Sequence, residues 1–440
     1  MKLQVTDSPV AMKQKNSNES LVEQIKDIKN KSLEQIDYSL KDLTSLKTYT
    51  IDDIRSKEID DAISLEYLDN SYRLWVHITS PCEYFDIASQ LDVYAEERAA
   101  STYLATETIY MMPYEIISDL LSLKKDRISY AISVFADLNS DGSINNSGIF
   151  RTIIKPSLKL SYDDADEILD IQPKEELALV KFKEILKRRR NWRLRNGAII
   201  IEEPQGKFIL EGEKITHEII EPTESRKLIS ESMILFGTII AKYCRSNNIS
   251  IPFRVQGGIN KNNDSYYTGN NKHVINFITK QTLSKSYISS IAEKHHSLGL
   301  DEYVQATSPL RRYIDIIVHF QLINDLKSTK LMNQDIINNK INNYTVKNRQ
   351  IIQRVRDNNR TIANKWFLNN NKICWAAIFL RWLHKPLNIA LIYFSELEID
   401  IACKLDGCQN AVLGTKLELK CSSSELKSDK ISFEALKVLG

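Results

Sequence analysis

Acidic side chains crowd into one short stretch of the chain, which reads TIDDIRSKEIDDAI from Thr50 to Ile63. Five carboxylates fall within ten residues there, namely Asp52, Asp53, Glu58, Asp60 and Asp61. Like charges this close repel one another, and burying several of them without compensation is costly. A divalent cation is the natural compensation, because hard oxygen ligands suit Mg²⁺ or Mn²⁺ together with water and a substrate phosphate. The stretch therefore predicts a metal site.

Three simpler structures compete with a metal site in this stretch. An EF-hand is excluded, because its central glycine and alternating acids are absent. A solvated acidic loop stays open, although such loops are seldom followed directly by an apolar strand such as Ala62–Leu65. A turn in which the acids cap backbone amides would account for two of the five carboxylates.

A second stretch, ATSPLRRYIDIIVHFQL from Ala306 to Leu322, combines a helix start with paired cations. Ser308 as N-cap and Pro309 at the first position predict a helix that begins there. Arg311 and Arg312 would then lie in the first turns, where cations are disfavoured unless an anion shares the site. A phosphate held by the helix N-terminus and an arginine fork would explain the arrangement. An arginine paired with a protein carboxylate remains the alternative.

These two stretches sit in a chain whose pattern predicts an α+β fold. Residues 1–43 form a polar lead-in, mobile or partly helical, with a loose helical pattern over Ser20–Lys41. Residues 44–368 alternate strand hairpins with long helices and predict one large domain with a mixed sheet. Residues 369–440 contain five short strands and predict a small all-β barrel of the OB type. The predicted helices are Glu175–Leu194, Ser225–Asn247, Leu310–Leu326 and Asn342–Leu368.

The composition is typical of a globular protein and does not indicate a binding partner. The 440 residues are 42% hydrophobic and 26% charged with a net charge of +2, so any basic surface must be local. Six scattered cysteines without CxxC pairs favour buried free thiols over a zinc site. No signal peptide and no apolar run of ~18 residues is found. We expect a soluble cytoplasmic protein, or one of an organelle interior, without a membrane partner.

A third feature is the basic run from Lys181 to Arg195, KFKEILKRRRNWRLR. Such a run could follow a phosphate backbone, with Trp192 available to stack on a base. A solvated helix face is the alternative.

Taken together, TIDDIRSKEIDDA and ATSPLRRYIDIIVHFQL closely resemble the ribonuclease II/ribonuclease R (RNB) family of exoribonucleases. Supporting matches are RAASTYLATETIYMMP, LISESMILFGTIIAKY and HSLGLDEYVQATSP, and the likeness runs from about Leu43 to Leu368, with a weaker extension to the end. The resemblance implies hydrolysis of single-stranded RNA from the 3′ end to nucleoside 5′-monophosphates, in RNA decay or processing. One or two Mg²⁺ ions, or Mn²⁺, would assist the reaction. No protein partner is implied.

The resemblance also implies roles for individual residues. Metal binding falls on Asp52, Glu58, Asp60 and Asp61, and catalysis on Asp60 and Arg311, the latter against the scissile phosphate. RNA contacts fall on Tyr103, Glu231, Arg311 and Arg312, with Tyr103 stacking on a base near the 3′ end.

Two positions depart from the family pattern. Glu58 stands where the family more often has Asp, and Arg356 stands near the place where it has a late glutamate in the catalytic channel. These departures keep open the alternative of a catalytically weakened RNA-binding protein of the same fold.

Overall fold

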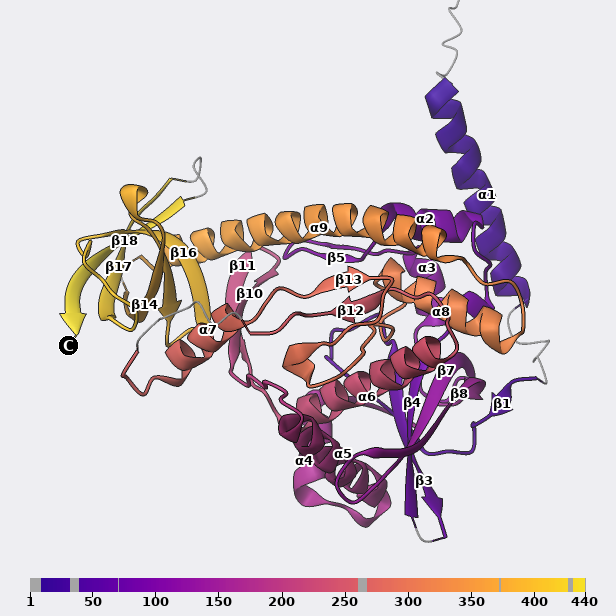
Figure 1. Cartoon of the computed structure of the whole chain (residues 1–440). Coiled ribbons are helices and arrows are strands. Elements are labelled where there is room, and N and C mark those ends of the chain that lie inside the picture. Colours follow the sequence, from indigo (N-terminus) through magenta and orange to yellow (C-terminus); the bar gives the residue numbers. More distant parts are fainter. Residues whose placement is uncertain are drawn as a thin grey trace, which may run out of the picture.

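The structure is a computed structural model, and it describes residues 9–31, 39–69, 71–259, 267–371, 373–425 and 430–439. Residues 32–38, within the helix predicted over Ser20–Lys41, lie outside the described residues, as does Asn70, where the sequence predicts a turn over Asp69–Ser71. Figure 1 shows the barrel and α1 (Pro9–Lys31) at opposite ends of the molecule, with a long helix, α9 (Gln334–Asn369), running between them.

The large domain is built on a seven-stranded mixed sheet in the order β1-β8-β7-β4-β3-β2-β9. Its middle strands are antiparallel neighbours, while β1 and β9 join the edges as parallel partners of β8 and β2. The predicted hairpins β3–β4 and β7–β8 are both present. The strands are β1 Lys41–Asp42, β2 Thr48–Asp52, β3 Asp61–Leu68, β4 Ser71–Thr79, β7 Ser129–Leu138, β8 Ile144–Ile154 and β9 Leu158–Ser161.

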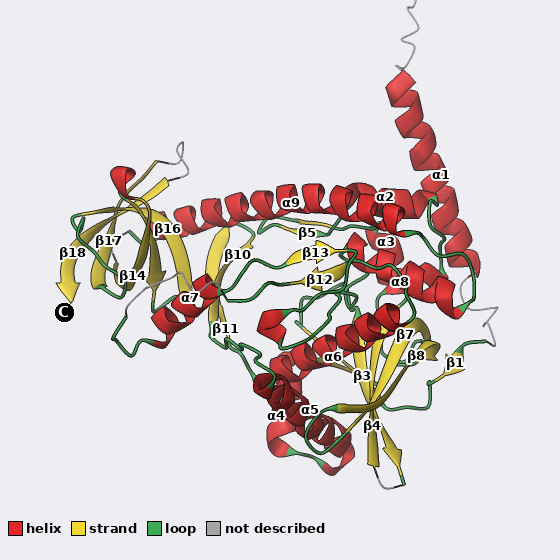
Figure 2. Cartoon of the chain, in the orientation of Figure 1, coloured by secondary structure: helices red, strands yellow, loops and turns green. Residues whose placement is uncertain are grey.

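Helices cover this sheet and join it to smaller two-stranded sheets (Figure 2). Helix α5 packs against β3, and α6 packs against β4 and β8, so that their apolar faces share one core with the strands. The helices of this domain are α2 Gln90–Arg98, α3 Tyr114–Ile116, α4 Tyr162–Ile171, α5 Leu177–Arg195, α6 Glu224–Ser246, α7 Lys272–Thr282, α8 Tyr313–Leu326 and α9 Gln334–Asn369. The additional strands are β5 Thr102–Tyr103, β6 Thr108–Ile109, β10 Gln205–Glu211, β11 Lys214–Ile220, β12 Phe253–Val255 and β13 Tyr287–Ser289.

The C-terminal segment closes into a five-stranded barrel in the order β14-β15-β16-β18-β17, which confirms the predicted all-β domain. Its strands are β14 Cys374–His384, β15 Ile389–Phe394, β16 Ile399–Asp406, β17 Lys416–Glu425 and β18 Lys430–Leu439. The barrel core is completed from outside the barrel by Phe367 of α9 and by Phe208 of β10, which packs against it. The barrel is thus joined to the large domain by shared apolar packing.

A close backbone approach makes the same junction rigid. The amide of Gly206 in β10 donates a hydrogen bond to the Glu398 carbonyl at 2.8 Å. A Cβ at Gly206 would lie 1.8 Å from the Leu397 carbonyl oxygen, so only glycine fits there.

The N-terminal lead-in is more ordered than the sequence suggests. Helix α1 covers Pro9–Lys31, and its residues Leu21, Ile25 and Ile28 are buried in the main core. The Leu91 amide of α2 also donates a hydrogen bond to the side chain of Gln24 at 2.8 Å. The lead-in is thus helical over this part, which is one of the two alternatives predicted for it, and the apolar side chains of the helix pack on the main core.

Two further expectations concern membranes and cysteines. In the described ranges no helix is long and apolar enough to cross a membrane. All six cysteines are free thiols, and four are buried, but Cys374 is exposed and Cys408 is partly exposed.

Candidate active site

The topology of β2 and β3 explains why the acids meet. The two strands are antiparallel neighbours with Thr48 opposite Ser64 and Tyr49 opposite Ile63. The C-terminal end of β2 and the N-terminal end of β3 therefore lie at the same end of the sheet, which places Asp52 near Asp60 and Asp61. The connecting loop is fixed where the Ile59 amide donates to Ser122 Oγ at 2.9 Å.

Asp60 is the most enclosed of these acids and is only 3% exposed. Its Oδ1 accepts a hydrogen bond from the Leu310 amide at 2.9 Å, and its Oδ2 lies 3.4 Å from Nε of Arg311. Burial raises the pKa of Asp60 well above its ordinary value, an effect that the Arg311 charge and the Leu310 amide oppose. Asp60 thus ties the first motif to the second across 250 residues.

Glu58 is buried and accepts hydrogen bonds at both carboxylate oxygens. Ser101 Oγ donates to Oε1 at 2.8 Å, and the Tyr103 hydroxyl donates to Oε2. Burial raises the pKa of Glu58, while these two hydroxyls lower it. Ser101 was not predicted as a site residue, although it lies inside the RAASTYL stretch that carries the resemblance.

Asp52 and Asp61 lie beside each other, and they differ in their hydrogen-bond partners. Asp52 Oδ1 accepts from the Asp53 amide at 2.7 Å, and burial raises its pKa. Burial and the neighbouring Asp52 charge raise the pKa of Asp61 from 3.8 to about 7, against the opposing effect of Arg311. Asp61 Oδ2 is buried and has no hydrogen-bond partner in the described part of the chain.

The second motif does not begin a helix where the sequence predicted. Helix α8 starts at Tyr313, and Arg312 is its N-cap residue. The Ser101 amide bonds to the Arg311 carbonyl at 3.0 Å and the Tyr313 amide to the Ala99 carbonyl at 2.8 Å, so this backbone pairs with another segment. Tertiary pairing overrides the local signal of Ser308–Pro309, so the predicted helix start is wrong, and Arg311 lies just before α8 rather than in its first turn.

The two adjacent arginines have different surroundings. Arg311 has a side chain 44% exposed and contacts Asp60 through Nε. Arg312 binds the fully buried Asp315, with Nη2 2.6 Å from Oδ2 and Nε 3.1 Å from both oxygens. Both arginines therefore pair with a protein carboxylate, Arg312 closely with Asp315 and Arg311 at longer distance with Asp60.

Glu231 lies in α6 and is buried. Its two oxygens accept from Arg193 of α5, with Oε1 2.8 Å from Nε and Oε2 2.5 Å from Nη2. Arg193 also donates to the Leu298 carbonyl at 3.0 Å. This fork joins α5, α6 and the loop that contains Leu298.

An open cleft of about 960 Å³ extends from Tyr103, whose hydroxyl bonds Glu58, to the barrel. Tyr103 is 45% exposed. Cations outnumber anions along the cleft, where Arg55, Lys207, Arg356, Arg360 and Arg381 face Asp357 and Asp400. Arg356, the departure from the family pattern, is one of these cations.

Tyr162 and Arg226 also lie near the acids, and neither was predicted from the sequence. The guanidinium of Arg226 lies 3.9 Å from the centroid of the Tyr162 ring. Burial raises the pKa of Tyr162, and the charges of Asp61 and Asp52 raise it further, so Tyr162 lies near both acids. Nothing in the local pattern signals this, because Tyr162 looks like an ordinary first residue of α4.

The carboxylates differ in how well they suit a divalent cation. No group of three or more His, Cys, Asp or Glu side chains within the described residues is arranged as a metal cluster. Asp61 Oδ2 is nevertheless a buried acceptor without a donor, beside a second raised-pKa carboxylate. Mg²⁺ prefers carboxylate oxygens, so Asp61, with Asp52 beside it, offers this ion its freest ligand atom.

Comparison with known proteins agrees with this geometry. The chain is 32% identical over 399 residues to an uncharacterized ribonuclease of Synechocystis, covering 90% of this chain and 60% of that protein. It is 29% identical over 341 residues to ribonuclease R of Chlamydia pneumoniae, covering 70% of this chain and 50% of that protein. The chain thus spans about half the length of these curated relatives.

Solved structures share the fold. The RNase R of Mycoplasma genitalium, solved with ribose-methylated single-stranded RNA, has a TM-score of 0.81 at 18% identity, covering 95% of this chain and 78% of that one. Yeast Ssd1, a pseudonuclease, has a TM-score of 0.66 at 15% identity, covering 88% and 54%. The model of the RNB domain matches residues 40–328, more than half of the chain. The chain is therefore a member of the RNB family, related to the ribonuclease II and ribonuclease R exoribonucleases.

Proposed function

We propose that this protein is a 3′→5′ exoribonuclease that hydrolyses single-stranded RNA to nucleoside 5′-monophosphates in RNA decay or processing, in the cytoplasm or an organelle interior. The observation that carries the proposal is the pairing of Arg311 with Asp60 beside Asp61, whose Oδ2 is buried without a hydrogen-bond partner among the described residues. Tyr103, which bonds Glu58, connects these acids to a cation-lined cleft. Such a site combines a fixed anion-binding arginine with a place for a divalent cation.

The cleft supports a nucleic-acid substrate. A row of cations attracts the phosphate backbone of RNA whatever its sequence. Tyr103 at the catalytic end offers a ring on which a base can stack. Arg356 adds one more cation to this path, in place of the negative charge that the family pattern has there.

Each residue of the site has a role in the proposed reaction. Asp52 and Asp61 would hold Mg²⁺, which when bound polarises the scissile phosphate and lowers the pKa of its water. Asp60 orients Arg311, whose remaining N–H groups face the phosphate, a fork that lysine cannot reproduce. Glu58 keeps the hydroxyls of Ser101 and Tyr103 in place.

For Arg312 and Glu231 we propose an indirect part in RNA binding. Their carboxylate–guanidinium forks are already complete within the protein, with Asp315 and Arg193. Both pairs hold elements that border the site, α8 in one case and α5 with α6 in the other.

A second candidate comes from a different class, an RNA-binding protein without turnover. It is favoured by one observation, that both oxygens of Glu58 are occupied by hydroxyls and offer little to a metal. It would bind RNA in the same cleft but release nothing.

The deciding experiment is a time course on 5′-labelled single-stranded RNA and DNA, with Mg²⁺ or with EDTA. We expect progressive shortening of RNA from the 3′ end with release of nucleoside 5′-monophosphates, little cleavage of DNA, and none in EDTA. The D61N variant, purified in the same way, controls for contaminating nuclease. Tight RNA binding with no shortening in Mg²⁺ or Mn²⁺ would support the non-catalytic candidate instead.

A further inference from the structure

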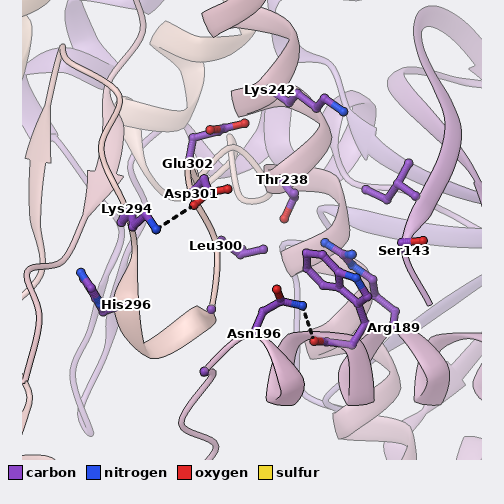
Figure 3. Close-up of a pocket in the computed structure, with 14 residues that line it drawn as sticks. Ser143, Arg189, Asn196, Thr238, Lys242, Lys294, His296, Leu300, Asp301 and Glu302 are labelled. Carbon is purple, nitrogen blue, oxygen red and sulfur yellow. Dashed lines mark hydrogen bonds and ion pairs between the residues drawn. The ribbon is translucent and has the colours of Figure 1, made fainter. Parts of the chain in front are cut away.

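A recess separate from the carboxylates lies between the tip of the β7–β8 hairpin, the end of α5, the middle of α6 and the loop after β13. Its volume is about 470 Å³. Figure 3 shows Arg189 and Asn196 from the end of α5, Thr238 and Lys242 from α6, and Lys294 and Asp301 from the loop. The basic run singled out from the sequence ends here.

Two glycine contacts fix the walls of this recess. A Cβ at Gly142, in the hairpin tip, would lie 2.1 Å from the Arg188 carbonyl oxygen. A Cβ at Gly299, in the loop, would lie 2.7 Å from the Arg193 carbonyl oxygen. Both glycines also have positive φ, so hairpin and loop dock tightly on the backbone of α5. The recess is therefore preformed.

Three of the eight cations of the basic run form ion pairs within the protein. Arg190 pairs with Glu202 at 2.5 Å, Arg193 with Glu231 at 2.5 Å and Lys181 with Glu184 at 2.9 Å. These three charges are therefore matched locally within the protein.

Arg189 is a buried cation of this run. It is 2% exposed, yet it forms no ion pair with a carboxylate of the described residues. Its Nη1 donates one long hydrogen bond of 3.4 Å to the Gly142 carbonyl, and its buried Nε has no partner there. Its guanidinium lies 4.1 Å from the ring centroid of Trp192. Burial of this unmatched charge lowers the pKa of Arg189 to about 10.

The remaining charges around the recess leave a surplus of positive charge. Asp301 is matched by Lys294 at 3.2 Å and Glu302 by Arg245 at 2.7 Å. Lys242, exposed on α6, has no ion pair in the described ranges. Arg189 and Lys242 are therefore the two cations that an incoming anion would meet.

We propose that this recess binds a phosphate monoester group. Arginine presents a planar fork that matches phosphate oxygens, and Lys242 adds a second point charge. The half-buried Trp192 adds an aromatic surface for the base of a nucleotide. Two sources share this chemistry, a free nucleoside 5′-monophosphate and the 5′-terminal phosphate of an RNA. The inference does not depend on the proposed hydrolysis.

The test is titration calorimetry on the full chain in EDTA, which removes divalent cations from the carboxylate site. The probes are inorganic phosphate, AMP, adenosine, and one RNA oligomer with and without a 5′-phosphate. The variants are K242A, K242E and R189Q, with circular dichroism to verify folding. K187A is the matched control, because Lys187 is an exposed lysine of α5 that does not line the recess.

We expect phosphate and AMP to bind wild type and K187A equally, and adenosine to bind at least roughly tenfold more weakly than AMP. K242A should lower the affinity for inorganic phosphate and for AMP about tenfold, and K242E should lower it further. If the protein binds the 5′-phosphorylated oligomer more tightly than the unphosphorylated one, and K242A removes the difference, the ligand is the RNA end. If AMP binds but the two oligomers bind equally, the ligand is the free nucleotide.

Absence of phosphate and AMP binding, or binding unchanged in K242A and K242E, overturns the proposal. Because Lys242 is remote from the acids, the RNA cleavage rate of K242A in Mg²⁺ should equal that of wild type, so failure here is distinct from failure of the proposed hydrolysis.

Discussion

The carboxylate end of the sheet and the interior of the barrel are built on opposite principles. At the sheet end, polar groups are buried close to groups of the same charge, so that burial raises the pKa of Asp52, Glu58, Asp60 and Asp61 together. In the barrel, the ring centroids of Phe367, Phe394 and Phe433 lie 5.0–5.1 Å from one another. The buried carboxylates lower the stability of the fold but keep charged groups available for chemistry. The packed aromatic rings of the barrel add stability and offer no reactive group.

The largest expected effect separates chemistry from binding. D61N should lower kcat for RNA hydrolysis at least roughly a thousandfold, about 4 kcal/mol of transition-state stabilisation, because the acceptor left free for a metal is lost. RNA affinity should stay within about threefold, since binding is spread over many phosphate contacts. R381A, in the cleft wall formed by the barrel, is the matched variant and should change affinity with little effect on kcat. Single-turnover kinetics with saturating enzyme, beside fluorescence anisotropy, measure both quantities. Near-normal turnover by D61N would remove Asp61 from the proposed metal site.

The second prediction concerns the shared core of the barrel. Phe367 is fully buried and contacts Trp375, Phe394 and Phe433. F367A should lower the stability of the barrel by about 3–5 kcal/mol, the usual cost of a large cavity in an aromatic core. Hydrogen exchange should show lost protection in β14–β18 while the seven-stranded sheet keeps its protection. Equal loss of protection in both regions would mean that barrel and sheet unfold as one unit.

The third prediction follows from the raised pKa of Asp61. In the unfolded chain this carboxyl titrates near 3.8, and in the folded protein the pKa is about 7. The folded state holds the proton more tightly, so without metal the free energy of unfolding should fall as pH rises from about 4 to 7 and stay low above that. D61N removes this penalty and should stabilise the metal-free protein at pH 8 by about 2–3 kcal/mol. Urea unfolding in EDTA at several pH values tests this, and Mg²⁺ should narrow the difference. Parallel pH profiles for wild type and D61N would contradict the raised pKa.

Local features of the fold could be predicted from the sequence, and long-range ones could not. The hairpins β3–β4 and β7–β8 and the five barrel strands follow from period-two patterns with turn residues between them. Helix α9 was predicted too short, and α8 begins at Tyr313 rather than at the predicted Pro309. The start of α8 depends on pairing between Ala99–Ser101 and Arg311–Tyr313, which are far apart in the sequence. No local propensity encodes such a pairing.

In the candidate site, too, local features could be predicted from the sequence and long-range contacts could not. The acids could be identified because they occur in one loop, and their meeting follows from a single hairpin. The partners that set their environment come from elsewhere, as with Ser101 and Tyr103 on Glu58, and Leu310 and Arg311 on Asp60. Residue types predicted the chemistry, whereas the tertiary structure decides which oxygens remain free for it.

The smallest expected effect lies where the two regions meet, at Tyr103. Its ring faces the cleft and its hydroxyl bonds Glu58, so Y103F and Y103A separate the two contacts. Y103A should lengthen the final RNA product by one or more nucleotides, because stacking contributes about 1–3 kcal/mol per base and short remnants depend on it most. Y103F keeps the ring and should keep the wild-type product length, with only a modest change in rate from the freed Glu58 oxygen. Long substrates would hide the loss, since distal phosphates still hold them in the cleft. The measurement is the smallest product from a 5′-labelled oligomer at fixed salt for the three proteins. If Y103A gives the wild-type end product at a slower rate, Tyr103 serves only to hold Glu58, and its role belongs to the carboxylate end rather than to the RNA path.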